Sequence, residues 1–507
     1  MGVAALHDFN AVRYRYTEFF PVDSDGNTGC TYGADAMRNR WWNRLVNQVA
    51  DRGLGLSKPN QNPDVMKRLE ENCRALLTSR GEASGVALAR EVARAVDELD
   101  ETGKTRFLQL LTERFGPDRN TVLAAAERFR NSDGRADLQE LLRVVEPPRQ
   151  EVFRRLNGAP DGTRVLVRLR ETLVRQLRAH PELETVNSDL QHLLKSWFNP
   201  GFLQLRRISW DRSPALLMEK LIQYESVHAI QSWEDLRRRL SGDRRCFGFF
   251  HPALPDEPLI FVEVALVEGL ATQTVSLLDP DAPVGNNAQA DTAIFFSISN
   301  CQVGLRGVSF GNFLLKQVMG ELISEFPHVQ RYATLSPVPG FACALRVEGD
   351  YEDGFTRDRI AALIQEYAET LCSTAGVADP VDALYQLLDD PLSNRVVLEE
   401  PLSRLVLAYL TRVRRRGSVA DSVARFHLSN GARLEQVAPF ADSSSTRLDA
   451  SFGMMVNYRY VVDSVEKNHE RFVKTGEVAI SRQLQKQLKQ VNAAWDSGAA
   501  GGVKPAV

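Results

Sequence analysis

"SISNCQVGLRGVSFGNFLLKQV", residues 297–318, passes from strand-forming residues through a glycine-containing run into a helix-forming run. Because glycine has no Cβ, Gly304, Gly307 and Gly311 allow backbone N–H groups to approach a ligand closely. A helix that begins near Phe310 adds its positive dipole end at the same place. The segment therefore predicts a loop that binds a pyrophosphate. Its glycine spacing matches neither a dinucleotide-binding fingerprint nor a Walker loop, so a tight connection without a ligand remains the alternative.

The segments around this loop are short and rich in β-branched and aromatic residues. We expect strands in "PLIFVEVAL" (258–266), "TAIFFSIS" (292–299) and "RYATLS" (331–336), and a helix in "FLLKQVMGELISEF" (313–326). The polar segment 279–291 between the first two strands is expected to be a surface loop. The second half of the chain is therefore predicted to be mixed α and β.

The first half has a different pattern, in which apolar residues recur at three- and four-residue steps. In the first such segment Asp64 provides the N-terminal cap and Gly81 ends the run. Similar amphipathic segments follow near residues 86–101, 104–115, 119–131, 136–145, 149–157, 162–179 and 182–195. No repeat of fixed length relates them, so we predict a compact all-helical bundle.

The chain of 507 residues is long enough for roughly two to four domains. We predict an N-terminal arm or adapter (1–60), a helical domain (61–197), a mixed α/β domain (198–490) and a disordered tail (491–507). The formal net charge of −3 gives no electrostatic basis for binding nucleic acid or an anionic membrane. No stretch is long and apolar enough to span a bilayer. The six cysteines are scattered without a CxxC pair, which favours a reducing cytoplasm over a disulfide framework or a zinc site.

One serine in the second half is held in a restricted conformation. In "TLSPVPGF" (334–341), Pro337 fixes its own φ and restricts Ser336 to extended geometry. The direction of the hydroxyl is therefore set before a ligand arrives. A rigid turn at the end of a strand is the alternative interpretation.

One histidine lies close to a strong turn signal. In "RFHLSNGARLEQV" (425–437), Asn430-Gly431 stands between alternating residues, which is the pattern of a β-hairpin. We therefore expect His427 on a rigid ribbon near the hairpin turn.

Four stretches, taken in order, resemble the malonyl-CoA decarboxylase family. They run from about Gly201 to Tyr460 and are "HPALPDEPLIFVEVAL", "SISNCQVGLRGVSFGNFLLKQV", "TLSPVPGF", and "RFHLSNGARL" followed by "GMMVNYRY". This resemblance implies an α+β multidomain protein, with a helical domain before a catalytic domain of the N-acetyltransferase-like fold. In that fold a glycine-rich loop holds the pyrophosphate of an acyl-CoA, and the two strands that flank the next helix splay apart.

The resemblance also implies functional residues. The family's catalytic serine and histidine fall on Ser336 and His427, and its acyl-CoA site falls on Arg306, Gly307, Val308, Ser309, Phe310, Gly311, Asn312 and Tyr460. Animal members carry an acidic residue where this chain has Ser309, so no carboxylate is expected there to polarise the histidine. Malonyl-CoA and acetyl-CoA are the implied substrate and product, without a metal. The helical domain is expected to assemble a homo-oligomer, with a tetramer as the implied assembly.

The chemistry of a malonyl thioester agrees with this resemblance. Loss of CO₂ leaves an enolate, and the thioester carbonyl itself accepts the electron pair, so no cofactor is expected. We expect Ser336 to orient the carboxylate and deliver a proton to Cα, with His427 as its acid partner. Three alternatives stay open: an acyl-CoA N-acyltransferase, a thioesterase in which Ser336 is a nucleophile, and a regulatory protein that only binds acyl-CoA.

The remaining titratable groups have structural interpretations. We expect His228 and His251 to be surface or packing residues, and Glu263 to need a hydrogen-bonding partner if it is buried in mid-strand. The runs "LRRRL" (236–240) and "VRRRG" (413–417) are expected to be solvated faces. Contact with the 3′-phosphate of coenzyme A is the alternative for each run.

Overall fold

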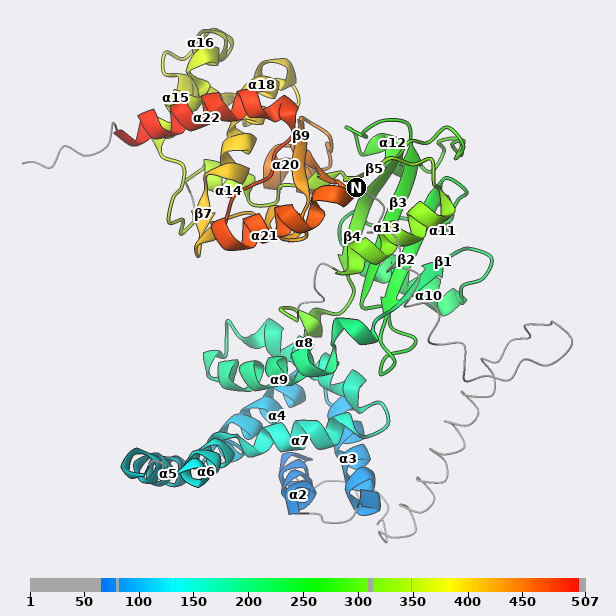
Figure 1. Cartoon of the computed structure of the whole chain (residues 1–507), viewed down its shortest axis with the longest axis vertical. Helices are drawn as coiled ribbons and strands as arrows, with labels where there is room; N and C mark the ends of the chain where they lie inside the picture. Colours follow the sequence, from blue (N-terminus) through cyan, green and yellow to red (C-terminus); the bar gives the residue numbers. More distant parts are fainter. Residues whose placement is uncertain (1–64, 79–81, 133, 309–312, 348, 501–507) are drawn as a thin grey trace, which may run out of the picture.

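The computed structural model describes residues 65–78, 82–132, 134–308, 313–347 and 349–500. A helical region comes first, a sheet with covering helices follows, and a further group of helices completes the chain (Figure 1). The predicted fold class, an all-helical region followed by a mixed α/β domain, is therefore confirmed. The arm predicted for residues 1–60 lies outside the described residues.

The eight helices predicted for the first half are all present, although several ends differ by a few residues. They are α2 (Val65–Thr78), α3 (Glu82–Asp97), α4 (Glu101–Arg114), α5 (Arg119–Asn131), α6 (Arg135–Val145), α7 (Pro148–Asn157), α8 (Gly162–Gln176) and α9 (Glu184–Trp197). Asp100 caps α4 by accepting the N–H of Gly103. Helix α8 lies at the centre, because it packs against α3, α4 and α7.

The second part of the chain is built on one mixed sheet. Its strands are β1 (Gln204–Ile208), β2 (Arg244–Phe250), β3 (Ile260–Val267), β4 (Thr292–Asn300), β5 (Arg331–Thr334), β6 (Ser336–Pro337), β9 (Arg433–Ala438) and β10 (Met455–Tyr460). The order is β1-β2-β3-β4-β5-β10-β6, with β9 also pairing with β10. Strands β4 and β5 are parallel and α13 (Phe313–Glu325) joins them, while the other described pairings in this sheet are antiparallel.

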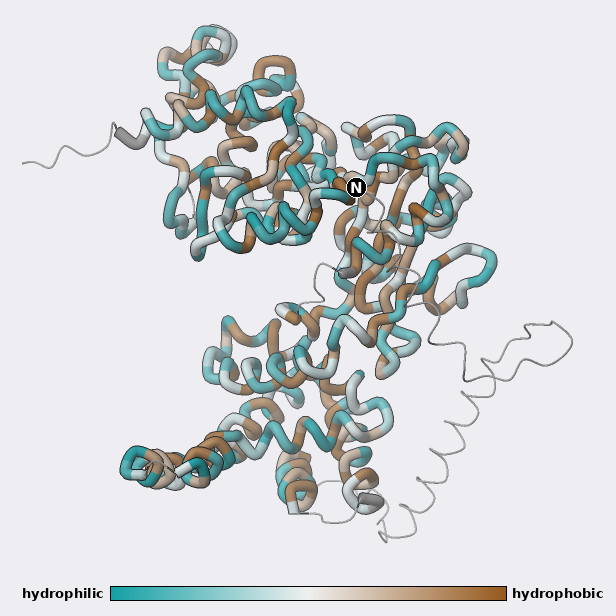
Figure 2. Tube along the Cα trace, viewed as in Figure 1, coloured by the Kyte–Doolittle hydropathy of each residue, from teal (hydrophilic) through white to brown (hydrophobic). Residues whose placement is uncertain are grey.

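The central strands are covered on both faces, which explains their composition. Every residue of β2 is buried, and β3 is buried up to its last residue. Strands covered on both faces are mainly apolar rather than alternating, and the charged residues here, Arg244, Arg245 and Glu263, have ion-pair partners. Figure 2 shows these hydrophobic runs along the strands and a mixture of hydrophobic and hydrophilic residues along the helices.

Further helices surround the sheet and form the C-terminal group. They are α10 (Ala215–Tyr224), α11 (Trp233–Arg239), α12 (Val275–Leu278), α14 (Phe341–Leu345), α15 (Arg357–Ile364), α16 (Ala368–Ala375), α17 (Pro380–Leu387), α18 (Arg395–Thr411), α19 (Ser422–Ser429), α20 (Ser445–Ser451), α21 (Val465–Thr475) and α22 (Arg482–Ala500). A short hairpin, β7 (Arg414–Arg415) and β8 (Ser418–Val419), follows α18. No helix of the described chain is long and apolar enough to cross a membrane.

The prediction of a disordered tail from residue 491 is wrong for residues 491–500. These residues continue α22, and the Trp495 side chain is fully buried, with its ring centroid 5.5 Å from that of Phe355. A Cβ at Gly498 would lie 2.7 Å from the Arg359 Cα, so the small residue allows α22 to pack closely on α15. Residues 501–507 lie outside the described residues.

The predicted hairpin around Asn430-Gly431 is also wrong. Residues 422–429 form α19, and Asn430 and Gly431 end this helix before β9 begins. Gly431 has a φ of +82°, and a Cβ there would lie 2.1 Å from the Val465 carbonyl oxygen. Glycine in the left-handed region after a polar residue is as typical of a helix end as of a hairpin turn.

Candidate active site

Ser336 lies at the start of β6, where the sheet opens. Strands β4 and β5 pair only from Thr292 with Arg331 to Phe295 with Thr334. Beyond this point β4 continues, while the chain after β5 turns so that Ser336 pairs with Val456 of β10. The two parallel strands therefore diverge beside Ser336, as the resemblance to the N-acetyltransferase-like fold implied.

The structure brings the two predicted catalytic residues together. The Ser336 Oγ lies 3.1 Å from the His427 Nε2, and it donates a hydrogen bond to the Thr334 Oγ1 at 2.8 Å. Both Ser336 and His427 are buried, with side chains from segments 91 residues apart. This contact depends on the packing of α19 against the sheet.

His427 is fixed on its other sides by two tyrosines of β10. Its Nδ1 lies 2.8 Å from the Tyr460 hydroxyl. Its ring stacks on the Tyr458 ring, with centroids 4.7 Å apart and planes inclined by 22°. Tyr460 is one of the predicted substrate-binding residues, and in the structure its hydroxyl contacts His427.

These contacts form one continuous chain of hydrogen bonds, from Tyr460 through His427 and Ser336 to Thr334. Since the Ser336 hydroxyl donates to Thr334, the His427 Nε2–H must donate to Ser336, and Nδ1 then accepts from the Tyr460 hydroxyl. The Thr334 Oγ1 also accepts the Tyr458 N–H at 3.2 Å. In this arrangement the Tyr460, His427 and Ser336 hydrogens all point along the chain in one direction.

Burial keeps these groups uncharged. It lowers the pKa of His427 to about 3, and it raises the pKa of Tyr460 well above the usual value for a tyrosine. At neutral pH the imidazole and the phenol are therefore both neutral. The hydrogen-bonded groups can therefore pass a proton from one to the next without any of them being charged beforehand.

A buried aspartate connects the segments that carry Ser336 and His427. Asp421 accepts the N–H groups of Val423 and Ala424 at 2.9 Å each, which caps the helix that carries His427. Its second oxygen accepts the Gly340 N–H at 3.4 Å, four residues after Ser336. Burial raises the pKa of Asp421 to about 6. The hairpin interpretation of this region concealed the cap signal of Asp421.

The predicted phosphate loop begins with a tight turn, η3 (Val303–Leu305). The N–H groups of Arg306 and Val308 donate to the carbonyls of Val303 and Leu305, at 3.0 and 2.9 Å. Gly307 has a φ of +79°, which favours glycine. These two amides are thus used within the turn, and Gly307 is where the backbone direction changes. Arg306 and Gly307 are exposed and Val308 is buried, while Ser309, Phe310, Gly311 and Asn312 lie outside the described residues.

The loop is also held from the helical region. The Arg170 Nη1 of α8 donates to the Gly304 carbonyl at 2.6 Å, and the Gln191 Nε2 of α9 donates to the Gly307 carbonyl at 3.1 Å. No pattern in the sequence indicated these contacts, because Arg170 and Gly304 are 134 residues apart.

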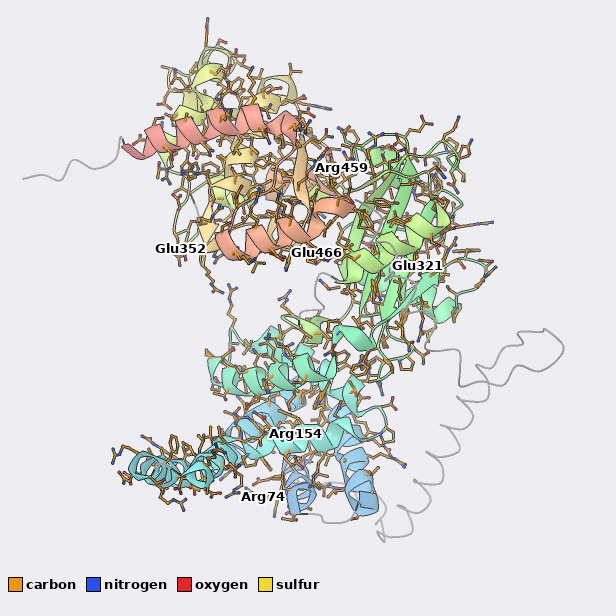
Figure 3. The ribbon with its side chains drawn as sticks, in the orientation of Figure 1. Arg74, Arg154, Glu321, Glu352, Arg459 and Glu466 are labelled. Carbon is orange, nitrogen blue, oxygen red and sulfur yellow. The ribbon has the colours of Figure 1, made fainter. Side chains whose placement is uncertain are left out.

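On another side, helix α21 approaches α13, which follows the loop. Figure 3 marks α21 by Glu466, α13 by Glu321, and the end of β10 by Arg459. Lys316 of α13 forms an ion pair with Glu466 of α21. The C-terminal group of helices is thereby joined to the sheet on the side of the loop.

A cavity of about 300 Å³ lies between α8 and the segment after β4. It is lined by Arg164, Val167, Arg168, Glu171, Arg175, Gln223, Tyr224, Leu254, Glu257, Cys301, Gln302 and Val303. Ser336 and His427 are not among these residues, so the cavity is separate from the hydrogen-bonded chain.

The structural interpretation of Glu263 agrees with its position. Glu263 is buried and accepts a hydrogen bond from the Arg239 Nη1 at 3.1 Å. The Arg239 Nε also donates to Asp235, at 2.7 Å. The prediction of a solvated face for residues 236–240 is therefore wrong for Arg238 and Arg239. Both guanidinium groups are buried, and each is bonded to a carboxyl group, Arg238 to Asp243.

The other predicted positions give a mixed result. In the run 413–417, Arg415 and Arg416 are exposed, whereas Arg414 is half-buried and donates to the Thr411 carbonyl. His228 and His251 are buried packing residues, and the His251 ring lies 4.7 Å from that of Phe198. Within the described ranges there is no cluster of side chains able to hold a metal ion.

A mixed sheet whose parallel strands diverge beside a buried serine–histidine pair, after an all-helical region, defines a multidomain protein of the α+β class. Family models give the closer assignment. The model "Malonyl-CoA decarboxylase C-terminal domain" matches residues 201–498, and "Malonyl-CoA decarboxylase N-terminal domain" matches residues 115–198. The chain belongs to the malonyl-CoA decarboxylase family. The two matches meet between residues 198 and 201, close to the predicted domain boundary.

Individual relatives agree with this assignment. The mitochondrial malonyl-CoA decarboxylase of Anser anser anser is 34% identical over 409 residues, which cover 76% of this chain and 80% of that protein. A crystal structure of malonyl-CoA decarboxylase from Rhodopseudomonas palustris is 44% identical, with a TM-score of 0.74 over 84% of this chain and 100% of that one. The structure from Agrobacterium vitis is 40% identical, with a TM-score of 0.71 over 84% and 99%.

Proposed function

We propose that this chain is a carboxy-lyase that converts malonyl-CoA to acetyl-CoA and CO₂. The observation that carries the proposal is the buried contact of 3.1 Å between the Ser336 Oγ and the His427 Nε2, in a member of this family. The contact lies where the parallel strands diverge. An acyl group that enters this opening would meet the serine hydroxyl.

The proposed reaction needs one proton and no oxidant or reductant. The bond between Cα and the carboxylate breaks, CO₂ leaves, and its electron pair forms the thioester enolate. The Ser336 hydroxyl delivers its proton to Cα, and the His427 Nε2–H replaces it. Tyr460 can then supply a proton to Nδ1, and water restores the chain after the product leaves. Ser336 forms no bond to the acyl group in this scheme.

The loop from Arg306 to Asn312 is proposed to bind the diphosphate of the acyl-CoA. Its exposed start at Arg306 and Gly307 and its position between β4 and α13 support this assignment. Since the amides of Arg306 and Val308 donate within the turn, the Gly307 amide is the first candidate donor.

The test is incubation of the purified protein with malonyl-CoA alone, followed by separation of the coenzyme A species. We expect acetyl-CoA and CO₂ in equal amounts. Free coenzyme A as the main product would identify a thioesterase. If malonyl-CoA stays unchanged until an amine is added, the protein is an N-acyltransferase. If it binds malonyl-CoA without any turnover, it is a regulatory protein.

We further propose that the helical region assembles a homotetramer. Helices α5 and α6 support this, because they expose large apolar side chains: Leu123, Phe129, Leu138, Leu142 and Val145. Sedimentation at micromolar concentration should give the mass of four chains, and the mass of one chain would remove the proposal.

A reducing compartment, and with it a cytoplasmic location, is proposed from the cysteines. A role in fatty acid metabolism is proposed from malonyl-CoA as the substrate. Cys73, Cys246, Cys301 and Cys372 are free thiols. Fractionation of the source cells with an antibody to the chain would test the location. Recovery in an organelle fraction would contradict it.

A further inference from the structure

The helical region and the phosphate loop touch through their backbones. A Cβ at Gly304 would lie 1.9 Å from the Val167 carbonyl oxygen of α8, so only glycine allows this approach. Helix α8 is also the central helix of its own region. The position of the loop is therefore tied to the most firmly packed helix of the neighbouring region.

Arg170 lies at this contact and is buried, with an exposed fraction of 2%. Its Nη1 donates to the Gly304 carbonyl at 2.6 Å, and its Nε donates to the Asn187 Oδ1 at 3.2 Å. Neither partner is a carboxylate. The carboxylate of Glu184 is reached only through Asn187, whose Nδ2 donates to it at 3.2 Å.

A buried guanidinium without a directly bonded carboxylate is energetically unfavourable, because the charge loses its hydration. Burial lowers the pKa of Arg170, yet an arginine keeps its proton at neutral pH. The other buried arginines of the described residues have bonded carboxylates, as Arg149 does with Asp189 at 2.6 Å. Glu184 offsets only part of the desolvation cost of this cation, so a further anion near Arg170 would be favoured.

The direction of the loop carbonyls acts in the same sense as the positive charge of Arg170. Arg170 and Gln191 draw the carbonyls of Gly304 and Gly307 toward the helical region. Two negative dipole ends are thereby turned away from the outer face of the loop. That face is left more favourable to an anion.

We infer that Arg170 is a positioning residue for the diphosphate of the acyl-CoA, because it holds the Gly304 carbonyl and supplies a positive charge behind the loop. The helical region is then part of the substrate site as well as an assembly element. This inference rests on the proposed function, since it takes acyl-CoA as the ligand of the loop.

The test compares a substrate that has the diphosphate with one that lacks it. Malonyl-CoA and malonyl-pantetheine share the reacting thioester, and only the first carries phosphates. We expect Arg170→Met to raise KM for malonyl-CoA and Kd for coenzyme A by about tenfold or more, with little change in kcat or in KM for malonyl-pantetheine. Arg170→Lys should recover part of the loss, because it keeps the charge.

Two further variants separate charge from folding. Asn187→Asp places a carboxylate beside Arg170 without removing it, so coenzyme A binding should weaken although the packing volume is unchanged. Arg149→Met removes another buried arginine of the helical region away from the loop, and it should not distinguish the two substrates.

The outcomes separate this inference from the proposed function. If Arg170→Met and Asn187→Asp alter both substrates alike, or neither, Arg170 has a structural role only and the inference fails. If the unaltered protein binds coenzyme A but does not decarboxylate malonyl-CoA, the proposed function fails, and the Kd comparison with coenzyme A still decides the role of Arg170.

Discussion

Two buried polar networks lie in the sheet domain, and they differ in charge. The chain from Tyr460 through His427 to Ser336 is made of neutral groups, whereas Arg239 is bonded to the carboxylates of Asp235 and Glu263. In the first network no counter-charge is bonded to His427, and burial lowers its pKa to about 3. In the second, the Arg239 charge is balanced chiefly by Asp235, because burial raises the pKa of Glu263 to about 8 and keeps much of that group protonated at neutral pH.

This difference separates a network that can move a proton from one that supports the fold. In the proposed reaction, proton transfer from serine to carbon leaves an alkoxide. The His427 Nε2–H can reprotonate it while Tyr460 protonates Nδ1, so the negative charge moves to the Tyr460 oxygen until water restores the phenol. In the second network the Arg239 guanidinium is bonded to Asp235 and Glu263, so its hydrogens are used within that network. We therefore expect substitutions in the first network to affect turnover and those in the second to affect stability.

The largest expected effect is that of His427→Asn on turnover. Without the Nε2–H the serine cannot be reprotonated, so kcat for malonyl-CoA should fall by a factor of about 10² to 10⁴. Steady-state kinetics at saturating substrate measures this, with Ser422→Ala at the exposed start of the same helix as the matched control. The double variant with Ser336→Ala should be little worse than the poorer single one. Multiplied losses would show two independent roles.

The second network should respond in stability instead. Arg239→Met removes the cation that is bonded to the buried Asp235 and Glu263 side chains, so the free energy of unfolding should fall by about 3 kcal/mol. Urea denaturation measures the change, and kcat of the folded fraction should remain near that of the unaltered protein. Addition of Glu263→Gln should recover part of the loss. If kcat falls while the free energy of unfolding is unchanged, the Arg239 network acts in turnover and not in stability, which contradicts the comparison between the two networks.

The phosphate loop provides a third kind of response, which is in binding. Gly307 has a φ of +79°, which strains a β-branched residue, and a Cβ there would lie 2.3 Å from the Gln191 Nε2. Gly307→Val should therefore shift the loop together with the Gln191 side chain. Coenzyme A affinity should fall by about tenfold while the fold survives. Gly320→Ala on α13, where a Cβ meets nothing within 4 Å, is the control. Equal affinity of Gly307→Val and the unaltered protein for coenzyme A would show that the loop is only a connection.

The last comparison concerns the pH dependence of stability. The pKa of His427 falls from 6.5 to about 3 on folding, so the unfolded chain binds more protons between these values. The stabilising contribution of the neutral ring is therefore present above pH 6.5 and is lost as the pH falls toward 3. Urea denaturation at several pH values should give a shallower acid dependence for His427→Asn than for the unaltered protein. Parallel curves would show that this histidine is not buried in neutral form.

The sequence predicts much of this fold because the local patterns are strong. The apolar period before residue 197 and the run around Gly304 identify the helices and the loop without tertiary information. Asn430-Gly431 misled the interpretation, because the same dipeptide ends a helix or turns a hairpin, and only the packing of Gly431 on Val465 decides between them.

The candidate site was predictable only in part. Ser336 and His427 follow from the family resemblance, but their contact with Thr334 and Tyr460 requires segments that are distant in sequence to meet. Arg170 could not be found in advance, since a lone arginine on an amphipathic helix has no local mark of a role in another domain. Its partner is a backbone carbonyl, which leaves no trace in the sequence.

Turnover of Ser336→Ala tests most directly whether the buried serine delivers the proton. Its kcat should be measured with saturating malonyl-CoA, together with its Kd for coenzyme A and the intact mass of the unaltered protein during turnover. We expect kcat to fall by a factor of about 10² to 10⁴, the Kd to stay unchanged, and no acyl-enzyme adduct to form. A kcat near that of the unaltered protein would contradict this role and would leave residues 334–341 as a rigid turn.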